Sequence, residues 1–287
     1  MLLGSAVAGP PRAEAVQQFR SATNTVAIYA SASDRAGAPV RDLTAADFEI
    51  EDDGRKQAIT VFENGIQPIT IAVLVDASPS LFAERPLAAA AVAAFAGRLI
   101  PGDRACLGTF NQSVSLDPRF TDREDVLVGH LGDGAAPWPA GTAVWDAVEA
   151  GRRALETEGG RRVILLLTDG ADNASRSDPD AIRTALQQSG MLVFAVGVRG
   201  RFGLDMTDLG ALANSTGGRA LELASPADVP DAMRRVADEL HNQYVIGFTP
   251  RALDDRWHRL KVKVRRDGVT VRTTRLYFAG RPEGSPR

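Results

Sequence analysis

Three oxygen-bearing side chains, Asp76, Ser78 and Ser80, alternate along a loop that follows the largely apolar run at residues 69–75. One carboxylate and two hydroxyls offer hard oxygen ligands, which suit Mg²⁺, Mn²⁺ or Ca²⁺ better than zinc. Aspartate and serine also favour turns and helix caps, so an ordinary capping loop is the alternative interpretation. The triplet therefore predicts a metal site only in combination with further ligands.

The elements around this loop are expected to place it on the rim of a sheet. The apolar run is typical of a strand buried on both faces, as in a parallel sheet. A helical, alanine-rich pattern follows from about residue 82 to 100. Strand, polar loop and helix are the beginning of a doubly wound α/β domain, in which ligands bind at the carboxyl ends of the strands.

Two later segments of the sequence contribute further oxygen-bearing side chains that could join the same site. Thr142 follows a glycine and opens a helical pattern, and Asp169 ends a second apolar strand in the sequence LLLTDG. With the triplet, they resemble the metal-ion-dependent adhesion site (MIDAS) of the von Willebrand factor type A (VWA) family. Each of the five positions has the residue type that this site needs. The expected metal-site residues are Asp76, Ser78, Ser80, Thr142 and Asp169.

The resemblance implies how such a site would work. In the family the hydroxyls bind the metal directly, while the carboxylates act mostly through water. The ion then keeps an incomplete octahedron and favours an outside carboxylate, typically an exposed Asp or Glu of a partner protein. Mg²⁺ is the first choice, with Mn²⁺ or Ca²⁺ as alternatives. The implied function is adhesion or scaffolding by a protein that is not an enzyme and has no catalytic residues.

Four further residues are candidates for the rim or the partner-binding surface. Asp172 and Asn173 follow the second apolar strand and either shape the rim or serve as plain loop residues. Asn111 ends a strand and either faces the metal pocket or belongs to a turn. Trp138 lies between two prolines, where it either contacts a partner, as aromatic residues do in binding hot spots, or packs the loop.

The flanking segments predict a second domain. Alternating apolar residues and the hairpin signal Asp53-Gly54 precede the α/β region, and a similar pattern with Asp267-Gly268 follows it. Two half-sheets suggest a small antiparallel β-sandwich into which the doubly wound, mostly parallel sheet is inserted. The expected ranges are 24–67 plus 243–280 for the sandwich and 68–242 for the VWA domain, after a disordered tail or signal-peptide remnant at 1–23.

The whole order of segments resembles a bacterial family of VWA-related proteins, through LTAADFEIEDDG before the α/β region and QYVIGF after it. Members are generally exported. The N-terminus has a short apolar run and an Ala13-Glu14-Ala15 pattern that resembles a signal-peptidase site, but it lacks a basic segment. The expected location is secreted, periplasmic or cell-surface. No apolar stretch approaches the length of a transmembrane segment.

Composition narrows the function further. The chain has 287 residues, 44% of them hydrophobic, which is ample for a packed core, and its net charge of −3 argues against nucleic-acid binding. The three histidines fall in no triad-like or metal-like spacing, and no hydrolase motif is present. Two alternatives stay open: a metal-independent structural module and a metal-dependent hydrolase, which has less support.

Overall fold

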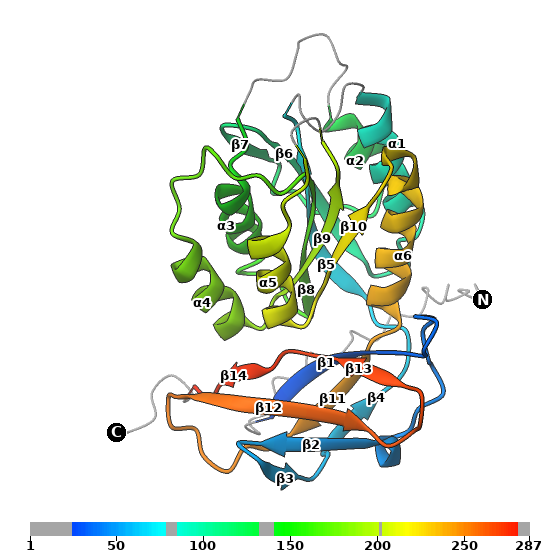
Figure 1. Ribbon diagram of the computed structural model, residues 1–287, viewed down its shortest axis with the longest axis vertical. Helices are drawn as coiled ribbons and strands as arrows, with labels where there is room; N and C mark the ends of the chain where they lie inside the picture. The colour runs from blue at the N-terminus through cyan, green and yellow to red at the C-terminus, as the bar shows by residue number, and fades with distance from the viewer. Residues whose placement is uncertain (1–24, 79–84, 132–140, 201–202, 281–287) are drawn as a thin grey trace, which may run out of the picture.

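The computed structural model describes residues 25–78, 85–131, 141–200 and 203–280. A mostly parallel sheet flanked by helices lies above a pair of antiparallel sheets (Figure 1). The lower part combines blue strands from the start of the chain with orange and red strands from its end (Figure 1). The α/β part is therefore inserted into a β-sandwich, and the predicted fold class is confirmed.

The strand at residues 69–76 is at the centre of the upper sheet. All eight of its residues are buried, because helices cover both faces of the strand. It pairs in parallel with the strands on either side of it, and only the short edge strand β7 is antiparallel. In sheet order the strands are β10 (Ala220–Leu223), β9 (Leu192–Val198), β8 (Arg161–Thr168), β5 (Ile69–Asp76), β6 (Arg104–Phe110) and β7 (Val114–Leu116).

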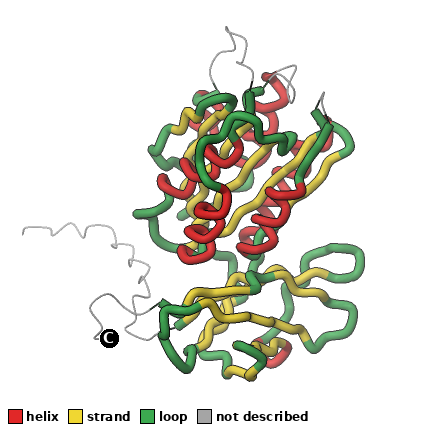
Figure 2. The backbone as a smooth tube through the Cα atoms, turned by 60° about the vertical axis from the view of Figure 1, so that its left-hand side comes forward, coloured by secondary structure: helices red, strands yellow, loops and turns green. Residues whose placement is uncertain are grey.

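Helices cover the two faces of this sheet (Figure 2). One face carries α1 (Arg85–Ala96), α2 (Glu124–Gly129) and α6 (Val229–His241). The other carries α3 (Val144–Ala154), α4 (Pro179–Ser189) and α5 (Thr207–Thr216). Ile71, Val73 and Val75 pack on the first face, whereas Ala72 and Leu74 pack on the second, as the two-residue period of a strand requires.

The lower part consists of two four-stranded antiparallel sheets. The first contains, in order, β13 (Thr270–Arg272), β1 (Val26–Ser33), β11 (Tyr244–Phe248) and β4 (Val61–Glu63). The second contains β14 (Leu276–Phe278), β12 (Trp257–Val264), β2 (Phe48–Asp52) and β3 (Arg55–Gln57). Both sheets contribute to one apolar core, in which the rings of Phe48 and Tyr244 contact each other at an interplanar angle of 58°, with 5.2 Å between their centroids. Neither half of the chain could build this core alone.

Tyr244→Phe is expected to lower the free energy of unfolding by about 1–2 kcal/mol. The Tyr244 hydroxyl donates to the carbonyl of Val40 at 2.9 Å and accepts from the amide of Leu43 at 3.1 Å. Phenylalanine fills the same space but leaves the buried Leu43 amide without this acceptor. Urea unfolding checks the value, and an unchanged midpoint would show that the hydroxyl does not stabilise the segment from Val40 to Leu43.

The chain passes between the β-sandwich and the α/β domain twice, and the buried side chain of Asp103 contacts both connecting segments. Its carboxylate accepts from the amides of Ile69 at 2.9 Å and Ile100 at 2.8 Å, and it lies 2.8 Å from Nε2 of His241. Ile69 begins β5, and His241 ends α6. Asp103 thus fixes the entry and the exit of the inserted domain at the amino-terminal edge of the sheet.

Candidate metal centre

The strand register brings the predicted metal-site aspartates to one edge of the sheet. Asp76 ends β5 and lies opposite Phe110 of β6, while Asp169 directly follows β8 on the other side of β5. Asp76 is 0% exposed and Asp169 is 3% exposed. This is the carboxyl-terminal edge of the parallel strands, and it faces away from the β-sandwich (Figure 1).

Asp76 is buried and bonded to polar groups on both of its carboxylate oxygens. One carboxylate oxygen accepts from the amide of Ser78 at 2.8 Å, and the other accepts from the hydroxyl of Thr168 at 2.7 Å. Burial raises the pKa of Asp76 to about 6; hydrogen bonds from Ser78 and Thr168 oppose this change, and the nearby charge of Asp169 adds to it. Among the described residues, no lysine or arginine forms an ion pair with Asp76. A bound cation would supply the missing positive charge.

Thr142 is held at the same edge by backbone contacts on two sides. Its amide donates to Oδ1 of Asn173 at 2.8 Å, and its carbonyl accepts from the amide of Asn173 at 2.9 Å. The amide of Ala143 donates to the carbonyl of Asn111, just beyond β6, at 2.7 Å. Thr142 and its neighbour Ala143 are therefore connected to the segments that follow β8 and β6, the neighbours of β5.

Asp172 and Ser175 organise the beginning of α3. Oδ1 of Asp172 accepts from the amide of Val144 at 2.8 Å, and the hydroxyl of Ser175 accepts from the amide of Trp145 at 2.9 Å. The Ser175 hydroxyl also donates to Asp172 at 2.5 Å. These side chains satisfy helix-end amides that have no partner within the helix. They fix the helix that begins two residues after Thr142.

The structure thus gives a place to most of the residues singled out from the sequence. Asp76, Ser78, Thr142 and Asp169 lie at one edge and are all nearly inaccessible. Ser80 and Trp138 lie outside the described residues. Three predicted rim residues serve local structure: Asp172 and Asn173 hold the segment that carries Thr142, and Oδ1 of Asn111 accepts from the amide of Ser113 at 3.1 Å in a tight turn.

Sequence reasoning missed two residues of this region. Thr168 donates to the Asp76 carboxylate, and Asp146 on α3 accepts from the amide of Ser177 at 2.8 Å, which fixes the loop after Asp169. The sequence shows Thr168 directly before Asp169, but its pairing with Asp76 follows only from the register of β5 and β8. The feature of the sequence that could have pointed to Asp146 is its place as the acidic residue in the first turn of α3.

The chemistry of this donor set fits a hard divalent cation. Asp76 and Asp169 bring two carboxylates, while Ser78 and Thr142 bring neutral hydroxyl oxygens. Mg²⁺, Mn²⁺ and Ca²⁺ prefer such oxygen ligands. No imidazole or thiolate belongs to this group, so the set does not favour zinc.

Asn173→Ala is expected to weaken divalent-metal binding by about tenfold, at the lower end of the range for residues that orient metal ligands. The variant removes the acceptor of the Thr142 amide, so the loop that carries the hydroxyl is no longer fixed. Calorimetric Mn²⁺ titration measures the effect, with the exposed Gln188→Ala as control. Equal affinities in Asn173→Ala and the wild type would contradict the role of Asn173.

Comparison with known families identifies the fold. The family model described as the von Willebrand factor type A domain matches residues 70–235, more than half of the chain. The chain belongs to the VWA family. The match covers the parallel sheet from β5 to β10, together with Asp76, Ser78, Thr142 and Asp169. Among curated proteins, no significant match is found.

Solved structures share this fold at low sequence identity. A von Willebrand factor type A protein from Catenulispora acidiphila has 12% identity and a TM-score of 0.55, over 93% of this chain and 78% of that chain. Proximal thread matrix protein 1 from the mussel byssus has 21% identity and a TM-score of 0.51, over 73% of this chain and 50% of that chain. The pilus adhesin SpaC from Lactobacillus rhamnosus GG has 12% identity and a TM-score of 0.50, over 80% of this chain and 47% of that chain.

Membership of the VWA family supports a protein-interaction module, because VWA domains are typically non-catalytic modules that bind other proteins, often with a divalent metal. Within the described ranges, none of the helices has both the length and the apolar character needed to cross a membrane.

Proposed function

We propose that the VWA domain binds a partner protein through a divalent cation, most simply Mg²⁺, at the carboxyl-terminal edge of the sheet. Asp76, Ser78, Thr142 and Asp169 would hold the cation, with Ser80 as the fifth residue expected from the sequence. The observation that carries the proposal is the fully buried Asp76 carboxylate, which lies near a second carboxylate and has no basic partner among the described residues.

The bound ion would supply concentrated positive charge and coordination positions that the protein leaves open. Hydroxyl ligands are neutral, so they do not neutralise a divalent charge. An exposed Asp or Glu of the partner would then complete the coordination. In this scheme the protein side chains position the ion, and no bond of the partner is broken, so the proposed function is not enzymatic.

The second part of the proposal concerns the arrangement of the domains. We assign residues 24–67 and 243–280 to a supporting β-sandwich and residues 68–242 to the binding domain. The sandwich lies at the amino-terminal edge of the parallel sheet, opposite Asp76 (Figure 1). The sandwich would keep the metal-binding edge of the VWA domain at the far end of the molecule, free to meet a partner protein. A secreted, periplasmic or cell-surface location would fit this design.

A peptide array tests the proposed recognition. The full chain is applied to random peptides with Mg²⁺ or with EDTA, and bound peptides are remade with Asp→Asn and Glu→Gln changes. We expect binding in Mg²⁺ to peptides that share an acidic residue, and loss of binding in EDTA, after the amide changes and in Thr142→Ala. Peptide binding of equal strength in EDTA would contradict the metal mechanism and favour a metal-independent module.

A further inference from the structure

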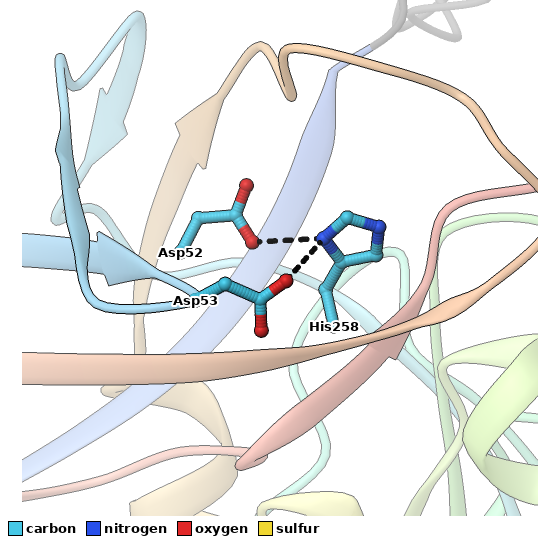
Figure 3. Close-up of side chains that lie close together, drawn as sticks. All are labelled: Asp52, Asp53 and His258. Atoms are coloured by element: carbon cyan, nitrogen blue, oxygen red, sulfur yellow. Dashed lines mark ion pairs between the residues drawn. The ribbon is translucent and has the colours of Figure 1, made fainter.

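A second cluster of metal-ligating side chains lies in the β-sandwich, outside the VWA domain. Asp52 ends β2, Asp53 follows in the hairpin turn, and His258 is the second residue of β12 (Figure 3). Nδ1 of His258 lies 3.3 Å from Oδ1 of Asp52 and 3.0 Å from Oδ2 of Asp53. Figure 3 shows both carboxylates directed at the same ring nitrogen. The three ligand atoms all lie within 4.8 Å of one another.

A buried polar group in this cluster has no hydrogen-bond partner. The side chain of Asp52 is 7% exposed, and its Oδ1 atom makes no hydrogen bond with the described residues. Nδ1 of His258, which faces this oxygen, makes none either. Buried polar atoms are nearly always hydrogen-bonded or bound to an ion, because desolvation without a partner costs free energy. With a neutral imidazole that has no hydrogen on Nδ1, the two atoms face each other as acceptors, and a bound cation between them would satisfy both.

The other side of the imidazole is fixed as in metal sites. Nε2 of His258 lies 3.0 Å from Oδ1 of Asp254 and is hydrogen-bonded to it. A carboxylate in this position favours the tautomer with hydrogen on Nε2, which leaves the Nδ1 lone pair directed at Asp52 and Asp53. The ring of Tyr277 stacks on the imidazole with 5.2 Å between centroids. These contacts orient His258 before any ion binds.

The distances and the charge suit a small cation. Ligand atoms that each lie about 2.0–2.2 Å from one ion are about 3.0–3.5 Å apart, which agrees with the two measured separations. Two carboxylates directed at one ring nitrogen favour a positive charge between the aspartates and the ring.

We propose that Asp52, Asp53 and His258 bind a divalent transition-metal ion, of which Zn²⁺ is the representative. One imidazole and two carboxylates are a common type of ligand set for Zn²⁺, whereas Mg²⁺ prefers oxygen ligands alone. This site is independent of the cation proposed for the VWA domain.

Binding at this site would join the two halves of the discontinuous sandwich. Asp52 and Asp53 come from the segment before the VWA domain, and His258 comes from the segment after it. The adjacent strands already pair, with Asp52 opposite Leu260, and the amide of Asp53 donates to the carbonyl of Arg259 at 2.9 Å. A metal ion there would act as a cross-link at the end of the ladder, and its binding free energy would add to the stability of the sandwich.

Zinc titration of the metal-stripped full chain tests the proposal. The measurement is made by calorimetry in excess Mg²⁺, and thermal unfolding is followed with and without Zn²⁺. We expect one saturable Zn²⁺ site and a higher Tm with Zn²⁺. Binding should be lost in His258→Gln and weakened by about 10–100-fold in Asp254→Asn, which alters only the residue that orients the imidazole. Asp76→Ala should retain the zinc site, which separates it from the cation of the VWA domain.

Two further measurements make the outcome decisive. Asp53→Asn changes a half-exposed side chain and should fold normally, but it should bind Zn²⁺ at least tenfold more weakly. Co²⁺ should give visible absorption bands in the wild type that His258→Gln lacks. The proposal is overturned if the wild type shows no saturable Zn²⁺ binding, or if His258→Gln binds Zn²⁺ like the wild type. In the first case the cluster holds a protonated histidine.

Discussion

Replacing Asp76 by asparagine is expected to stabilise the metal-free protein at pH 7 by about 1–3 kcal/mol, while it abolishes divalent-metal binding. Asp76 is completely buried, and burial raises its pKa from 3.8 to about 6. The folded protein therefore carries a poorly solvated charge at neutral pH. Asparagine has nearly the same shape and removes that charge. Its amide oxygen can still accept from the Ser78 amide, and its NH2 group can donate to the Thr168 hydroxyl oxygen, which reverses the direction of that hydrogen bond.

The sign of the effect follows from proton binding. Because the pKa of Asp76 is higher in the folded state, the folded protein binds more protons than the unfolded chain between about pH 4 and 6. Stability therefore falls as the pH rises through this window, and the penalty is complete at pH 7. A difference of about two pKa units corresponds to roughly 3 kcal/mol, which is the upper limit for the gain in Asp76→Asn.

Urea unfolding in EDTA at pH 7 and at pH 4 measures this gain. We expect Asp76→Asn to be more stable than the wild type at pH 7 and the difference to shrink at pH 4. The exposed Asp122→Asn should change stability by less than about 0.5 kcal/mol at either pH. A clear loss of stability in Asp76→Asn at pH 7 would show that the buried carboxylate stabilises the metal-free fold.

The same carboxylate should make metal binding dependent on pH. With a pKa of about 6, Asp76 is mostly ionised at pH 7 and mostly protonated at pH 5. A cation must displace this proton, so the apparent affinity for Mn²⁺ is expected to fall about tenfold between pH 7 and pH 5. Calorimetric titration at the two pH values checks this, and equal affinities would show that the ion does not compete with a proton on Asp76.

Asp103→Ala is expected to lower the free energy of unfolding by about 3–5 kcal/mol, a large part of the stability of a typical domain. The carboxylate of Asp103 is 2% exposed and accepts from two backbone amides, those of Ile69 and Ile100. It also contacts the buried imidazole of His241. Alanine leaves all three groups without this partner in a place that water reaches poorly.

Thermal and urea unfolding measure the loss in Asp103→Ala. The control is Asp238→Ala, which removes an exposed carboxylate that lies 3.8 Å from Arg98 and should cost less than about 1 kcal/mol. A similar small cost for both variants would show that Asp103 does not fix the junction. A large loss would show that the entry and exit of the VWA domain depend on one buried carboxylate.

Much of the fold follows from local patterns in the sequence. The apolar run at 69–75 is buried throughout because it forms the middle strand of the parallel sheet. The sandwich could be predicted because each end of the chain contained strands and a hairpin signal but too few apolar residues for a separate core. The positive φ angles of Asp53 (48°) and Gly54 (77°) agree with the hairpin turn expected there.

The position of Asp76 and Asp169 at one edge could be predicted as well, since the carboxyl ends of parallel strands meet there, whereas metal binding by these residues stays a prediction. The direction in which the loop side chains point could not be predicted from the sequence. Asp172 and Asn173 are directed at backbone amides of the Thr142 segment, and this depends on how the loop crosses the start of α3. The cluster of Asp52, Asp53 and His258 was also out of reach, because it forms only when β2 pairs with β12 from the other end of the chain.

The most direct test of the central claim is a calorimetric titration of the full chain with Mg²⁺ and Mn²⁺ at pH 7, repeated with Asp76→Ala, Thr142→Ala and His258→Gln. Circular dichroism confirms that each variant is folded. We predict one saturable site for both ions in the wild type and in His258→Gln, and its loss in Asp76→Ala and Thr142→Ala. Unchanged Mg²⁺ and Mn²⁺ affinities in the folded Asp76→Ala and Thr142→Ala variants would contradict a metal-dependent binding site at this edge of the VWA domain.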